Sequence, residues 1–284
     1  MTTATMTAPV ARATVQRAPL GRLLRAELRW IFRRPRTLIA LGLLALVPLL
    51  VAIGIKVAGP SSSPAGIVGV LLGNGFALPV VVMMLLLQVM LPLVAAMSAA
   101  DAIAGESANG TWRGLLLAPI GKVRLFGIKA TGVLAVSFAA TAVITVSGVI
   151  CGFALLGSNG LLTLSGSTLG VWAALGRVGL ALLWVTVQVF AIGAIALAIS
   201  ASTEHPLVVM AATLAGLIAL NVVQQISTLD WLHPYLITQN WTAVIDLLRD
   251  PVPTGSLWAG LARGGCYLVI GLSVALARTV SKEG

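Results

Sequence analysis

Six long apolar segments constrain this chain more than any other feature of its sequence. A membrane-spanning helix needs about 20 apolar residues, because the hydrocarbon core is about 30 Å thick and a helix rises about 1.5 Å per residue. The segments that meet this requirement are 37–57, 67–100, 130–157, 170–200, 206–228 and 256–277. The sequence therefore predicts an all-α polytopic membrane protein, with a cytoplasmic N-terminal segment (1–36), a six-span domain (37–277) and a cytoplasmic tail (278–284).

The composition excludes a soluble fold. Hydrophobic residues make up 58% of the chain and charged residues 9%, whereas a soluble domain has roughly 25% charged residues. The net charge of +10 does not indicate a nucleic-acid partner, because eight of the bases are arginines before residue 37. At that position an anionic inner leaflet would attract a juxtamembrane segment, and no fold that reads nucleic acid is visible.

The second segment, 67–100, is too long for a simple span. It contains Gly73, Asn74, Gly75, Pro79 and Pro92. These residues predict a kinked helix or one that protrudes from the membrane.

Lysine and arginine counts orient the spans. With the N-terminus inside, the inner segments hold fourteen bases, whereas the outer connections hold only Lys56 and Arg249. Arg177 and Arg263 fall within spans, near the predicted outer ends. Both termini are therefore expected in the cytoplasm.

Residues 20–34 predict an amphipathic helix that lies in the membrane interface before Pro35 interrupts it. Leucines and an isoleucine recur at helical spacing on one side, and arginines take the other. Glu27 is the exception, since it lies on the apolar stripe and its nearest arginines point elsewhere. A tertiary or intersubunit partner for Glu27 is expected.

The outer connection 229–255 predicts a short helix that Asn240 can cap and Pro251 ends. Its apolar stripe and its flanking aromatic residues suit an interfacial belt. The aromatic residues expected in that belt are Trp231, Tyr235, Trp241 and Trp258. Whether this segment is an anchor or a lid over a substrate path is left open by the sequence.

The inner connection between the second and third spans concentrates polar residues that the rest of the chain avoids. Asn109-Gly110 indicates a turn, Thr111 can cap a helix over 112–117, and Pro119 ends that helix. Lys122, Arg124 and Lys129 then lead into the third span. This order predicts a short helix held parallel to the membrane, which could pass a push from a soluble partner to the neighbouring spans. An ordinary positive-inside loop would need the bases but not the turn–helix–turn order.

This loop resembles the E-x3-G-T-x3-L-L-x2-P pattern, with a later lysine, of ABC-2-type transporter permeases. The matching positions are Glu106, Gly110-Thr111, Leu115-Leu116, Pro119-Ile120 and Lys129. Six spans, an interfacial helix before the first span and helical structure between the last two are also similar to that family.

The resemblance implies the membrane half of an ATP-driven exporter in a bacterial cell membrane. Residues 106–119 would contain the coupling helix that docks on a cytoplasmic ABC ATPase, and the interfacial helix would lie against the same ATPase, which would give Glu27 a partner. The residues expected to take part in coupling are Glu27, Glu106, Gly110, Thr111, Arg113, Pro119 and Lys129. A second permease copy, identical or not, and membrane lipids complete the expected partners.

The chain lacks the motif with which such an exporter binds nucleotide. A P-loop needs G-x-x-x-x-G-K-[ST], and the only Gly-Lys pair, Gly121-Lys122, is followed by Val123. No cofactor is expected in this chain, and ATP and magnesium are expected on the separate ATPase.

Two other function classes compete with this interpretation. An intramembrane enzyme needs converging ionisable groups, but His205 and His233 are the only histidines and are predicted on opposite sides of the membrane, so neither a catalytic nor a metal site is expected. An ion-gradient-driven secondary transporter is the stronger alternative, although no acid falls at the centre of a span. A scaffold or immunity protein without transport activity has no distinctive signature.

Mid-membrane polarity is limited to neutral side chains. They are Gln88, Gln188, Asn221, Gln224 and Gln225. They suit either interhelical hydrogen bonds or a weakly polar substrate path. The apolar spans and short outer segment favour a hydrophobic or amphiphilic cargo such as a drug, an antimicrobial peptide or a lipid.

Overall fold

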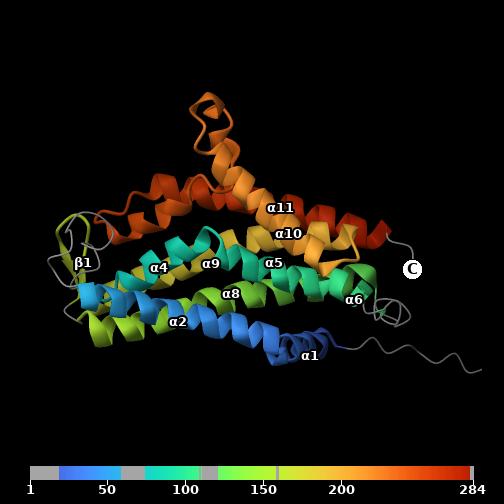
Figure 1. The fold of residues 1–284 in the computed structure, drawn as a ribbon, viewed down its shortest axis with the longest axis horizontal. Helices are drawn as coiled ribbons and strands as arrows, with labels where there is room; N and C mark the ends of the chain where they lie inside the picture. Colours follow the sequence, from blue (N-terminus) through green and yellow to red (C-terminus); the bar gives the residue numbers. More distant parts are fainter. Residues whose placement is uncertain (1–18, 59–73, 109, 111–120, 158–159, 282–284) are drawn as a thin grey trace, which may run out of the picture.

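The computed structural model describes residues 19–58, 74–108, 110, 121–157 and 160–281. Long helices lie side by side in an elongated bundle (Figure 1). The elements before the small hairpin are α1 (Leu20–Arg33), α2 (Pro35–Ala58), α4 (Leu78–Leu87), α5 (Met90–Ala102), α6 (Ala104–Ala108) and α8 (Lys122–Leu155). From the hairpin onward they are β1 (Leu161–Leu162), β2 (Thr168–Leu169), α9 (Val171–Ser202), α10 (Pro206–Val223), η1 (Ser227–Leu229), η2 (His233–Tyr235), η3 (Trp241–Leu248) and α11 (Thr254–Ser281).

The predicted all-α polytopic class is confirmed. Within the described residues, α2, α8, α9, α10 and α11 are each long and apolar enough to cross a membrane, and α4 with α5 makes up to a sixth span. In two places the bounds differ from those expected. The third span begins at Lys122 rather than at residue 130, and the fifth ends at Val223 rather than at residue 228.

The long second segment is a broken helix in the part that the structure describes. Its two halves, α4 and α5, meet at an angle of 59°. The break lies at Gln88 and Val89, and Pro92 follows within the first turn of α5. Proline has no N–H to donate to the preceding turn, which favours a kink at this place.

Glycines allow the closest contacts between spans. A side chain at Gly148 would lie 2.8 Å from the Pro79 ring at the start of α4. On α11, a side chain at Gly260 would lie 2.7 Å from the Trp184 indole, and one at Gly264 would lie 2.9 Å from Gln188. Small residues therefore set the spacing of α8 against α4 and of α9 against α11, as expected where helices pack within lipid.

The two ends of the bundle differ in what they carry. One end, the α6 end, holds α1, α6, the start of α8 and the end of α11, so both described chain ends lie there (Figure 1). The opposite end, the η3 end, holds the hairpin, in which Leu161 pairs with Leu169, and η3. If α4 and α5 together form one span, the described residues make six crossings, and an even number of crossings brings both described chain ends to one end of the bundle.

The segment between α10 and α11 consists of short 3-10 helices, and η3 occupies the position of the predicted helix. Two expectations about it were wrong. Asn240 makes no capping hydrogen bond, because its side chain instead bonds the Ser256 carbonyl and the Arg263 guanidinium. Trp241 is 1% exposed and packs in the bundle core, so it is not an interfacial aromatic, whereas Trp231, Tyr235 and Trp258 are exposed.

Candidate functional site

A buried charge cluster joins three elements at the α6 end. Lys129 lies in the first turns of α8, Glu27 on α1 and Glu106 on α6. The Lys129 ammonium lies 2.9 Å from Glu27 Oε1 and also donates to Glu106 Oε1. One cation therefore holds the interfacial helix and the start of the inner connection against the third span.

Burial makes this cluster energetically sensitive. The side chains of Lys129 and Glu106 are 3% and 9% exposed. Burial raises the pKa of the Glu106 carboxyl above its ordinary value of 4.5, and the neighbouring Lys129 opposes that rise. Removing one member of a buried ion pair leaves an uncompensated charge, which costs about 3–5 kcal/mol.

A second set of contacts ties the same helix to α5. The Arg34 guanidinium lies 3.2 Å above the centre of the Trp30 ring. It also forms an ion pair with the Asp101 carboxylate at 3.0 Å. Arg36 lies 3.5 Å from the same carboxylate, and the Lys129 ammonium lies 5.5 Å from the Trp30 ring. Stacking and ion pairing together fix the link between α1 and α2.

Close packing brings the Glu27 carboxylate within reach of Lys129. Gly132 lies on α8 opposite α1, and a side chain there would come within 2.7 Å of Ile31 Cδ1 and 3.8 Å of Glu27 Cγ. Without a side chain at Gly132, the two helices approach closely enough for the ion pair to form.

The structure brings together three of the seven residues expected to take part in coupling, namely Glu27, Glu106 and Lys129. The partner expected for Glu27 is found within the chain: it is Lys129. Gly110 lies in a turn with a φ of 71°, a left-handed conformation that favours glycine. Thr111, Arg113 and Pro119, with the predicted helix over 112–117, lie outside the described residues.

The polar residues expected near mid-membrane do not converge. Gln188 lies mid-span and donates to the Gly260 carbonyl on α11 at 3.0 Å, as the hydrogen-bonding alternative expects. Gln88 lies at the break between α4 and α5. Asn221, Gln224 and Gln225 were wrongly placed at mid-membrane, because α10 ends at Val223 and puts them at its end.

The residues at the end of α10 mostly bond locally. Asn221 donates to the Leu217 carbonyl one turn earlier, and Gln225 donates to the Asn221 carbonyl. Gln224 donates to the Gln239 side chain. A role for these residues in a substrate path stays a prediction.

Sequence reasoning did not find Trp30, Arg34 and Asp101 as parts of the site. Arg34 was counted only as one of many inner bases, and Asp101 only as one of two acids in the inner connection. The available signal was an isolated acid at the inner end of the second span facing arginines just before the first. Charge counts orient a span, but they do not pair charges across 67 residues of chain.

A comparison with known families identifies the family of the chain. The model of the family described as ABC-2 family transporter protein matches residues 22–254, which is most of the chain and includes Glu27, Glu106 and Lys129. No curated protein matches the chain significantly. Members of this family are membrane components of transporters that associate with an ABC ATPase. The chain belongs to the ABC-2 transporter family and is a multi-pass membrane permease of an ABC-type transporter.

Proposed function

We propose that this chain is the transmembrane subunit of an exporter that moves a hydrophobic or amphiphilic substrate outward with ATP hydrolysed by a separate subunit. The observation that carries this proposal is the cluster of Lys129, Glu27 and Glu106. Glu106 precedes the family's coupling loop and Lys129 follows it, so the cluster ties both ends of that loop to each other and to α1.

The cluster is suited to transmit a movement of the coupling loop to the membrane-spanning helices. A displacement of the loop moves α6 at one end and the start of α8 at the other. Because α1 is fixed to the same lysine, and Arg34 directly after α1 pairs with Asp101 on α5, α1 cannot keep its position without breaking these ion pairs. ATP-driven closure of the ATPase would thereby rearrange α1, α5 and α8 as one unit.

Two permeases and two ATPases form the proposed complex. The break between α4 and α5 supports a second permease, because irregular backbone is not stable against lipid. Leu85, Val89 and Met90 around this break are exposed in the single chain. Much of α10, which packs beside α5, is also exposed. A second copy on this side would cover the break, and Gln88 would then lie on the path between the two subunits.

Orientation and cofactors follow from the same proposal. The α6 end faces the cytoplasm of a bacterial cell, in accordance with the excess of bases there, so both termini are cytoplasmic. The permease needs no cofactor of its own. ATP and magnesium bind the partner ATPase.

Two substitutions test the coupling step in the complex purified with its ATPase and reconstituted in vesicles. Glu106→Ala removes one carboxylate while Glu27 still pairs with Lys129, and Gly110→Pro forces φ to about −65° where the native value is 71°. Both variants are expected to insert and to hydrolyse ATP while losing ATP-dependent export.

The matched control is Gly127→Ala, at a position on α8 where a side chain would meet nothing within 4 Å. Wild-type export per ATP in both variants would overturn the coupling mechanism. Export that persists without the ATPase and follows an imposed ion gradient would instead identify a secondary transporter.

A further inference from the structure

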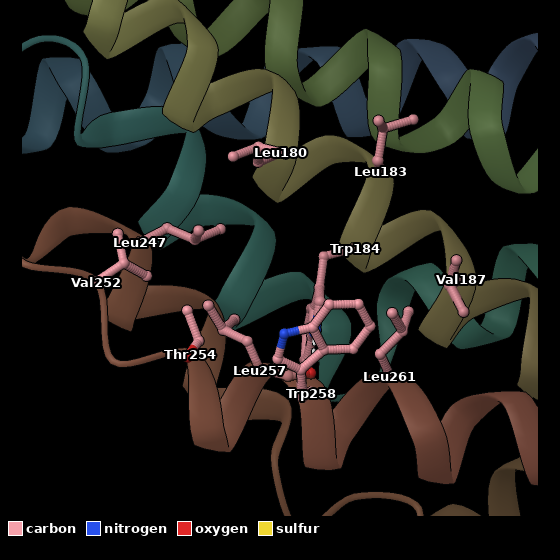
Figure 2. A pocket seen from close by; sticks show the side chains of 10 residues that line it. All are labelled: Leu180, Leu183, Trp184, Val187, Leu247, Val252, Thr254, Leu257, Trp258 and Leu261. Carbon is pink, nitrogen blue, oxygen red and sulfur yellow. Dashed lines mark hydrogen bonds between the residues drawn. The ribbon is translucent and has the colours of Figure 1, made fainter.

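An apolar groove opens on the membrane-facing side of the bundle, at the η3 end and away from the charge cluster. It lies between α9, α11 and the chain around η3, and its volume is about 490 Å³ (Figure 2). Side chains from all three elements line it, among them Leu180, Leu183, Val187, Leu247, Leu257 and Leu261. Pockets that bind small molecules have volumes of about 300–1,000 Å³.

The chemistry of the lining excludes a polar ligand. Thr254 carries the only hydroxyl group among the lining residues, and it is the first residue of α11, at the mouth of the groove. The Trp184 indole N–H is already used, since it donates to the Leu257 carbonyl at 3.0 Å. Below the mouth, the lining side chains offer only carbon surface to a ligand.

The groove is also shorter than the thickness of one membrane leaflet. Thr254 lies at the start of α11, whereas Val187 lies at the middle of α9 (Val171–Ser202). From Leu180 to Val187 the helix axis rises about 10 Å, and half of the hydrocarbon core is about 15 Å thick. Along the helix axis the groove therefore extends over about two thirds of the thickness of one leaflet.

The walls of the groove are continuous with the surface that faces lipid. Leu180 and Leu183 are 55% and 57% exposed, and Trp258 at the rim is 66% exposed. An exposed tryptophan near the end of a span is typical of the headgroup level. In Figure 2 the Trp258 ring lies between the side chains that α9 and α11 contribute.

Arg177 holds the wall that η3 contributes. Its guanidinium donates to the carbonyls of Leu247 and Arg249, at 3.2 and 2.9 Å, and lies 3.5 Å from Asp250. These bonds tie the end of η3 to α9. The groove is thus a fixed feature of the packing, with its polar groups satisfied at the rim.

We propose that this groove binds one acyl chain of a phospholipid from the leaflet at the η3 end. The ligand class follows from the carbon lining, a length that fits within one leaflet and the lateral opening to lipid. The bound chain fills the space between α9 and α11 and keeps η3 against the bundle. This inference needs only the membrane location of the chain and does not depend on ATP-driven export.

The test counts lipid that stays on the protein. The full chain is reconstituted in mixed vesicles of phosphatidylethanolamine and phosphatidylglycerol, extracted again in mild detergent and washed in steps. Native mass spectrometry then counts phospholipids per chain. The wild type is expected to keep one phospholipid after the surrounding lipid has been removed.

Leu183→Trp places an indole in the groove and is expected to lower the retained lipid by about tenfold or more. Val269→Trp is the matched control, because Val269 is 61% exposed on α11 but does not line the groove. Equal retention by Leu183→Trp and wild type, or equal loss in both variants, would overturn the proposal.

A second readout needs no variant. Phospholipid with brominated acyl chains replaces the ordinary lipid. The washed protein is compared with protein that was reconstituted in unbrominated phospholipid. The retained chain is expected to quench indole fluorescence, because Trp184 and Trp258 line the groove. A wild type that retains no phospholipid and shows no quenching would overturn the proposal. The ATPase is absent from both experiments, so their failure would leave the exporter function untouched.

Discussion

The ammonium of Lys129 lies 2.9 Å from the carboxylate of Glu27, although 102 residues separate the two in the chain. The contact joins the interfacial helix α1 to the third span. Glu106 shares the same ammonium, so a single lysine organises the α6 end.

Replacing Lys129 by methionine is expected to lower the free energy of unfolding by about 3–5 kcal/mol, because the buried Glu106 and the partly buried Glu27 carboxylates then lose the ammonium that both bind. Thermal unfolding in detergent measures the loss. Lys122→Met is the control, since Lys122 lies at the start of α8, donates to the Val280 carbonyl and is not a member of the cluster. The triple variant Lys129→Met, Glu27→Gln, Glu106→Gln is expected to recover part of the loss. Equal melting of Lys129→Met and Lys122→Met would contradict the assigned role of the cluster.

The raised pKa of Glu106 predicts a pH dependence of stability. Between the ordinary pKa of 4.5 and the raised value, the unfolded chain loses this proton while the folded chain keeps it. The part of the free energy of unfolding that comes from the raised pKa of Glu106 is therefore fully present below pH 4.5. It is lost as the pH rises through the raised pKa. Melting temperatures of wild type and Glu106→Gln, measured across this range, are expected to diverge in that direction. Parallel curves would show that Glu106 does not titrate there.

Gly132→Val is expected to separate α1 from α8, since even a Cβ at that position would crowd the Ile31 side chain. Overpacking of this kind costs about 1–3 kcal/mol. Limited trypsin digestion measures the effect, because α1 carries several exposed arginines and detachment would let the helix unfold at these cleavage sites. Gly127→Val, on the same helix with open space around it, is expected to be cleaved at the wild-type rate. Equal cleavage of both variants would rule out Gly132 as the docking position.

Gln188→Leu separates a structural role from a role in the substrate path. The lost hydrogen bond to the Gly260 carbonyl is expected to cost about 1 kcal/mol in stability. Gln225→Leu is the control, because that side chain is exposed and bonds only within its own segment. If Gln188→Leu instead melted as the wild type does but exported poorly, Gln188 would belong to the path.

The sequence predicted the elements that obey a single local rule. The length of the apolar segments predicted the spans. The helical spacing of leucines on one side and arginines on the other predicted α1. The position of Glu27 on the apolar stripe showed that it needed a partner. The partner itself was outside the reach of such rules, because α1 and α8 are brought together by tertiary packing, which the absence of a side chain at Gly132 allows.

The same limit explains the wrong expectations. The fifth span was expected to reach residue 228, but α10 ends at Val223, immediately before Gln224 and Gln225, so Asn221, Gln224 and Gln225 lie at its end. Trp241 looked like an interfacial aromatic because its neighbours are polar, but η3 folds back and buries it. In both cases a turn determines where the residues lie. The sequence pattern that predicts a 3-10 turn is weaker than the apolar run that predicts a span.

The most direct test of ATP-driven export is affinity purification of the full chain in mild detergent, with every stoichiometric companion identified by mass spectrometry. The account predicts a companion with a P-loop that is lost when residues 111–120 are replaced by a glycine–serine linker and retained in Gly127→Ala. A chain that purifies without an ATPase and still moves substrate down an ion gradient would contradict the account.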